Sequence, residues 1–315
     1  MRKIIFKTNY NVLIWHFVDM LSKWNYFVEP FIHKYYKKEW GLSQKDRKQL
    51  QAYSQKRSKF GWDAESDLFE WAFQGFPTNK KFSSLLEHIQ YFERQRNKQN
   101  KTLQSILKKQ LDNVLEGKEY IESQMKQADV NQIIGKISNL LGFKMTGYNP
   151  ISAYLACSMI KGSSQGGANG DGIYAEIPPG EYDRAYEIII HEYLHKALRP
   201  HKYFKEIQNE NLRHLYNSKV NKIYQDELYH FLEEVIIHSL SDVIIHGINP
   251  EEKIDQTIKY TELKKLRRNR WIRLWTATKI VAPILKKYLA NSLDKDETLA
   301  KINQKLKTYL ENTSQ

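Results

Sequence analysis

The segment EIIIHEYLHKAL, residues 187–198, places two histidines four positions apart with a glutamate directly after the first. On an α-helix such histidines project from one face, so the imidazoles of His191 and His195 can bind one Zn²⁺ at about 2.0–2.1 Å. Glu192 lies beside them, and its carboxylate can accept a proton from a metal-bound water whose pKa the ion lowers to near 7. The pattern indicates a hydrolytic zinc site, and the alternative is a structural helix with capped or solvated histidines.

The sequence around this motif predicts a helix from about Glu181 to Arg199. Prolines precede and follow the stretch, acidic residues stand in its first turn, and basic residues stand in its last turn, as the helix dipole favours. One broad face of this helix is apolar, and it consists of Tyr186, Ile189, Ile190, Tyr193, Leu194 and Ala197. His191, Glu192 and His195 share the narrower opposite face, so the helix itself gathers the three polar groups.

The order of the strand-like segment GIYAEI, the motif HEYLH and a helical tail resembles the zincin metallopeptidases over about residues 135–250. This resemblance implies an α+β, mainly α fold: a zincin-like core with a small mixed sheet, an HExxH active-site helix and a helical C-terminal subdomain. It also implies that the strand around Ala175 binds an extended peptide substrate by β-augmentation. The N-terminal third resembles no family that we can name.

The third metal ligand distinguishes the zincin groups. The residues after His195, KALRPHKYF, do not continue the metzincin pattern, whereas a gluzincin takes a glutamate from a later helix. Within DELYHFLEEVIIHSLSDVII, Glu233 and Glu234 lie in an apolar run where a bare carboxylate is costly unless it is paired or metal-bound. Glu234 is favoured because it shares a helix face with His238, which would orient it, and Glu233 remains the alternative. No residue is assigned to stabilise the oxyanion.

The pattern along the chain predicts three parts: a helical N-terminal region at residues 1–135, the zincin-like catalytic core at 136–250 and a helical C-terminal region at 251–315. Short β-branched and aromatic runs between Gly142 and Ile177 mark the one expected sheet region. The glycine-rich segment KGSSQGGANGDG lacks the lysine and hydroxyl residue of a phosphate-binding loop. It is interpreted as a hairpin connection between two strands.

Composition sets the broad class of protein. A chain of 315 residues with 41% hydrophobic content can bury a substantial core, and its single cysteine cannot form an intramolecular disulfide. No signal peptide and no apolar run long enough for a transmembrane segment is recognised, so a cytoplasmic location is expected. The oligomeric state cannot be predicted from these features.

The net charge of +13 is compatible with binding to nucleic acid, an anionic membrane surface or an acidic protein. The sharpest basic cluster, at 264–273 within KKLRRNRWIRLW, is interpreted as a solvated helix face whose tryptophans enter the core, in preference to a binding surface. The expected function is that of a zinc-dependent peptidase acting on a peptide or protein substrate. The alternative is a catalytically inactive zincin-like scaffold that acts as a basic binding protein.

Overall fold

The computed structural model describes residues 4–22, 42–61, 64–78, 81–99, 101–142, 150–158, 166–168, 172–198, 212, 216, 228–241 and 265–312. Its contacts divide the chain into two compact units. We call residues 2–125 and 148–192 the sheet unit, and residues 126–147 and 193–315 the helical unit. The three sequence-based parts, 1–135, 136–250 and 251–315, are not tested by this grouping and remain a prediction.

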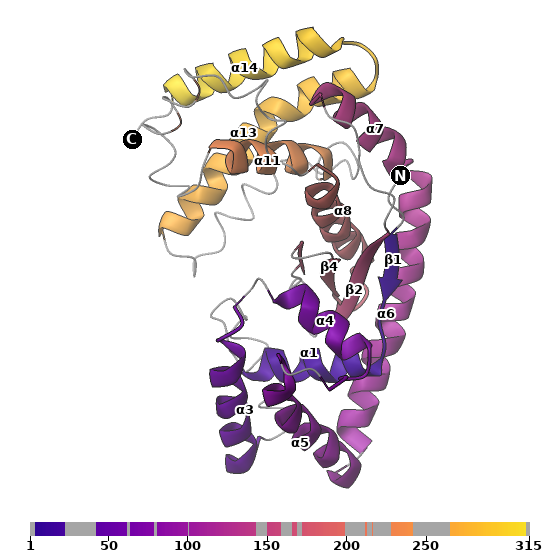
Figure 1. The fold of residues 1–315 in the computed structure, drawn as a ribbon. Helices are drawn as coiled ribbons and strands as arrows, with labels where there is room; N and C mark the ends of the chain where they lie inside the picture. Colours follow the sequence, from indigo (N-terminus) through magenta and orange to yellow (C-terminus); the bar gives the residue numbers. More distant parts are fainter. Residues whose placement is uncertain are drawn as a thin grey trace. The chain divides into compact units, whose positions relative to one another are not determined.

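A small mixed sheet forms the centre of the sheet unit (Figure 1). Its strands β1 (Ile4–Lys7), β2 (Ile151–Cys157), β3 (Gly166–Gly167) and β4 (Gly172–Ile177) lie in the order β1-β2-β4-β3. The pairs β1–β2 and β2–β4 are parallel, and β3 pairs with β4 in the antiparallel sense. Together with the many helices, this sheet confirms the expected α+β, mainly α class.

Two expectations about the sheet were wrong. Strand β1 lies in the region predicted to be helical, and its four residues pair with 151–154 far along the chain. The long strands β2 and β4 run parallel, so the glycine-rich segment between them is not a simple hairpin. Two of its glycines instead form β3, whose short antiparallel pairing with β4 occupies the other side of that strand.

Helices of the N-terminal region pack against this sheet or against one another. They are α1 (Tyr10–Ser22), α3 (Gln44–Arg57), α4 (Glu65–Phe73), α5 (Ser83–Gln99) and α6 (Lys101–Gln127). Helix α1 is buried over nearly its whole length because it contacts α3, α4, α5 and β2. Phe69 of α4 stacks on Tyr154 of β2 and Tyr174 of β4, with ring centroids 5.8 and 5.1 Å apart, which seats α4 on the sheet.

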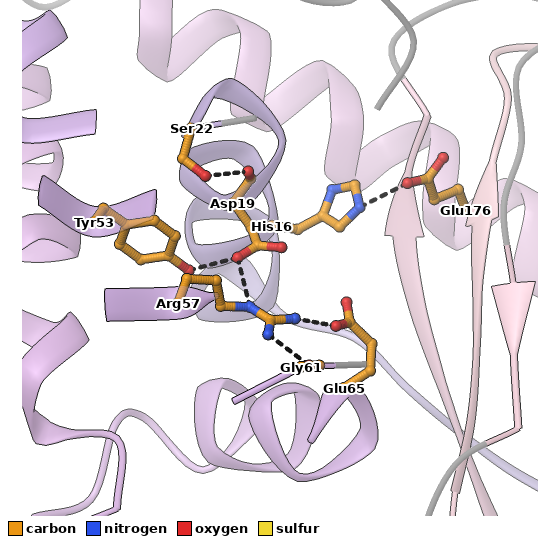
Figure 2. A network of polar contacts seen from close by, with 8 residues as sticks. All are labelled: His16, Asp19, Ser22, Tyr53, Arg57, Gly61, Glu65 and Glu176. Atoms are coloured by element: carbon orange, nitrogen blue, oxygen red, sulfur yellow. Dashed lines mark hydrogen bonds and ion pairs between the residues drawn. The ribbon is translucent and has the colours of Figure 1, made fainter. Parts of the chain in front are cut away.

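A fully buried arginine joins three of these helical segments (Figure 2). Arg57 donates to Asp19 Oδ1 over 3.0 Å and to the Gly61 carbonyl over 2.9 Å, and it also donates to a carboxyl oxygen of Glu65. Tyr53 donates to the same Asp19 oxygen over 2.6 Å. One guanidinium thus faces two buried carboxylates, and it can offset the charge of only one of them. Burial, followed by the charge of Asp19, raises the pKa of Glu65 to about 8 despite the opposing effect of Arg57.

A second buried pair ties α1 directly to the sheet. His16 of α1 contacts Glu176 of β4, with 3.0 Å between Nε2 and Oε1, and the two side chains are 10% and 3% exposed (Figure 2). Because polar groups buried among apolar residues are stable only with hydrogen-bond partners, this pair restricts how α1 can lie on the strand. The N-terminal helices and the sheet therefore form one packed body.

The helical unit contains α7 (Val130–Leu140), α11 (Leu228–His238), α13 (Lys265–Leu289) and α14 (Lys295–Asn312). Helix α13 packs against both α11 and α14. Lys136 of α7 donates to the Leu289 carbonyl over 2.7 Å, and Tyr288 donates back to the Lys136 carbonyl over 3.1 Å, so α7 is tied to the end of α13. None of the described helices is long and apolar enough to cross a membrane.

The basic cluster at 264–273 falls at the start of α13, as the predicted helix requires. Most of its side chains lie outside the described residues. Trp275, which follows the cluster, is only 6% exposed, in agreement with the interpretation that its aromatic residues enter the core.

Candidate metal centre

The motif lies on helix α8 (Tyr182–Leu198), which differs by one residue at each end from the predicted helix. Its predicted apolar face is buried: Tyr186, Ile189, Ile190, Tyr193 and Leu194 are each 4% exposed or less. On the opposite face, His191 and Glu192 are half-buried and His195 is 7% exposed. The local sequence was therefore sufficient to predict this helix and the face that carries His191, Glu192 and His195.

His195 is held between two consecutive carboxylates of α11. Its Nδ1 lies 2.8 Å from Glu233 Oε1, and its Nε2 lies 3.5 Å from Glu234 Oε1. The Glu233 side chain is 2% exposed, whereas that of Glu234 is 28% exposed. One ring nitrogen of His195 thus faces a buried carboxylate, and the other faces a carboxylate that solvent can reach.

His191, one turn earlier on α8, completes a group of three possible ligands. One ligand-type atom each of His191, His195 and Glu234 lies within 4.8 Å of the other two, and these three form the one such group found among the described residues. Tetrahedral zinc with ligands at about 2.0–2.1 Å places its donor atoms about 3.3 Å apart. The 3.5 Å between His195 Nε2 and Glu234 Oε1 is close to that spacing, so small side-chain movements would allow these residues to hold the ion.

Sequence analysis left Glu233 as the alternative to Glu234, but both glutamates approach α8. Neighbouring positions on a helix point about 100° apart, so helix phase alone does not bring two consecutive side chains to the same partner. Both reach His195, because each contacts a different nitrogen of the same ring. The sequence did carry a signal for this: two consecutive carboxylates in an apolar run each need a partner.

His238 lies where the sequence placed it, one turn after Glu234. Its Nε2 is 3.5 Å from Glu234 Oε2, the oxygen that does not face His195. Its ring also packs on Trp275 of α13, with centroids 4.3 Å apart. The distance to Glu234 is longer than that of a hydrogen bond, so the expected role of His238 in orienting Glu234 stays a prediction.

Glu192 faces the short strand β3 in the sheet unit. A Cβ atom built on Gly166 would lie 3.4 Å from Glu192 Cγ and only 2.2 Å from Ile188 Cγ2, so the strand backbone approaches α8 as closely as glycine permits. Ala175, the expected substrate-binding position, pairs with Leu155 of β2 on one side and with Gly166 of β3 on the other. Its backbone edges are therefore already occupied, and β3 is one of the two edge strands of the described sheet.

Comparison of the chain with protein-family models, with curated proteins and with solved structures finds no match. The interpretation of this site therefore rests on its own residues and geometry.

Proposed function

We propose that the protein is a zinc-dependent metallopeptidase in which His191, His195 and Glu234 bind the ion and Glu192 is the general base. The observation that carries the proposal is the approach of a carboxylate from α11 to two histidines one turn apart on α8. Two imidazoles and one carboxylate form a donor set that suits zinc. Three protein ligands leave a fourth position for water or substrate, as in catalytic rather than structural zinc sites.

Each residue has a distinct part in the reaction. A zinc ion bound here would act as a Lewis acid and lower the pKa of its water. Glu192 follows His191 directly on α8 and is half-buried, so its carboxylate is available to accept the proton of the attacking water. It then delivers that proton to the amine that leaves when the peptide bond breaks. His238 Nε2 lies 3.5 Å from the second oxygen of Glu234, so a small shift on metal binding would let it hydrogen-bond that oxygen and direct the other toward the ligand group.

The sheet supports a peptide as the substrate. Strand β3 is an edge strand in the described sheet, and its Gly166 lies against the side chain of Glu192. An extended peptide that adds to an exposed strand edge gains backbone hydrogen bonds without requiring a particular side chain. We therefore assign the substrate-binding edge to Gly166–Gly167 instead of to Ala175.

Metal content and turnover test the proposal together. Purified protein should carry about one Zn²⁺ per chain by elemental analysis, and the double variant His191→Ala/His195→Ala should carry almost none. Hydrolysis of an unfolded protein substrate should stop on treatment with a chelator and return when zinc is added. Stoichiometric zinc in the double variant would contradict the ligand assignment.

The variant Glu192→Gln separates metal binding from chemistry. Gln keeps the length of the side chain and the helix but cannot accept the proton, so zinc should remain while hydrolysis falls by about two to four orders of magnitude. Equal turnover in this variant and the wild type would identify a contaminating protease. Bound zinc without turnover in the wild type would instead favour the non-catalytic binding protein.

A further inference from the structure

Glu233 is the most deeply buried charged group near the candidate ligands. Its side chain is 2% exposed, and its neighbours on α11, Leu232, Val235 and Ile236, are buried apolar residues. A carboxylate in such surroundings is stable only when strong hydrogen bonds replace those of water. The contact with His195 Nδ1 at 2.8 Å has the length of such a bond.

The chemistry of the two groups determines the direction of this bond. If the Glu233 carboxylate is ionised, it can only accept, and the hydrogen then lies on Nδ1 of His195. In a neutral imidazole, a hydrogen on Nδ1 leaves the lone pair on Nε2, which is the nitrogen that faces Glu234 at 3.5 Å. The buried contact therefore aims the basic nitrogen of His195 toward the candidate ligand group.

We propose that Glu233 is a positioning residue that holds His195 in the Nδ1–H tautomer, with Nε2 directed toward the metal position. The proposal rests on the metal site described above, but its central claim concerns the metal-free protein. Metal-binding histidines commonly donate their second ring hydrogen to a carboxylate or carbonyl, and loss of that partner weakens metal binding by about 10- to 100-fold. Glu233 thus acts through His195, whereas Glu234 binds the ion directly.

Two substitutions separate positioning from structural support. Glu233→Leu removes the acceptor and fills the buried space with an apolar side chain of similar volume, but it leaves Nδ1 of His195 without this partner and should therefore lower stability. Glu233→Gln keeps an acceptor oxygen at nearly the same place and should restore the bond to Nδ1. Glu234→Ala is the matched control at the neighbouring position, because it removes a ligand and leaves the Nδ1 contact in place.

The first measurement uses metal-free protein with ¹⁵N-labelled histidine, in which long-range ¹H–¹⁵N correlation spectra distinguish the two tautomers. The His195 signals are identified by their loss in His195→Gln. The wild type, Glu233→Gln and Glu234→Ala should show hydrogen on Nδ1, whereas Glu233→Leu should show Nε2–H or a mixture. Hydrogen on Nε2 in the wild type, or an unchanged tautomer in Glu233→Leu, would overturn the proposal.

The second measurement is zinc affinity by chelator competition on the same variants. Affinity should fall about 10- to 100-fold in Glu233→Leu, change much less in Glu233→Gln, and fall further in Glu234→Ala than in either. Wild-type affinity in Glu233→Leu would also overturn the positioning role.

Failure of the wild type to bind zinc would instead remove the proposed function, while the tautomer spectra would still decide whether Glu233 orients His195. If Glu233→Leu does not fold, the comparison of Glu233→Gln with the wild type remains, and hydrogen on Nε2 in either would refute the proposal.

Discussion

The pair of carboxylates around Arg57 should make stability depend on pH through Glu65. With a folded-state pKa of about 8, Glu65 keeps its proton at neutral pH, while in the unfolded chain its ordinary pKa of 4.5 applies. Between these values the folded state binds more protons, so the free energy of unfolding falls as the pH rises. At about 1.4 kcal/mol per pH unit, with only half of that slope at each of the two pKa values, the accumulated loss between pH 4.5 and 8 is about 4 kcal/mol.

The variant Glu65→Gln should remove this dependence. Gln resembles the protonated acid and retains an oxygen that can accept from Arg57, so the variant should match the wild type near pH 4.5. Above that value it should become the more stable protein, by roughly 2 kcal/mol at pH 6 and roughly 4 kcal/mol at pH 8. Urea unfolding curves at several pH values, followed by tryptophan fluorescence, measure the difference.

Glu87→Gln is a matched control, because Glu87 is 65% exposed and its contact with Lys56 lowers rather than raises the pKa of its carboxyl. Its stability curve should run parallel to that of the wild type above pH 5. A constant difference between Glu65→Gln and the wild type from pH 5 to 8 would refute the reasoning. It would mean that Glu65 is ionised throughout and that its pairing with Arg57 outweighs burial.

Four further substitutions test other parts of the structure. Arg57→Leu should lower the free energy of unfolding at pH 7 by about 3–5 kcal/mol in urea titrations, because it leaves Asp19 buried without its cation. Gly166→Ala should lower the free energy of unfolding by about 1–3 kcal/mol and reduce hydrolysis, because the added carbon would lie 2.9 Å from a backbone oxygen of β4. Gly135→Ala on α7 should instead raise the free energy of unfolding by about 0.5–1 kcal/mol, because the added carbon would meet no neighbouring segment within 4 Å. His238→Ala should weaken zinc binding by about 10- to 100-fold in chelator competition, less than Glu234→Ala, and an equal loss in the two would make His238 a ligand.

Local sequence was sufficient for the helix that carries the motif. The flanking prolines, the terminal charges and the period of apolar residues all act within a few turns, so they predicted α8 to within one residue at each end. The same local rules placed His191, Glu192 and His195 on one face of that helix. The overall class followed from the same patterns, because many amphipathic segments surround one short region rich in strand-forming residues.

Tertiary structure alone decided which segments meet. Strand β1 has only four residues, and its pairing with β2 depends on a contact across more than a hundred residues that no local pattern encodes. The parallel pairing of β2 with β4 could not be predicted either, because composition indicates that a strand exists but not the direction of the strand beside it. Arg57 stands in a strongly polar helix, and it is buried because Asp19 and Glu65 approach it from other segments. The sequence alone could not distinguish the roles of Glu233 and Glu234. Helix phase gives the direction of a side chain, but only the packing of α11 on α8 decides which nitrogen of His195 each carboxylate contacts.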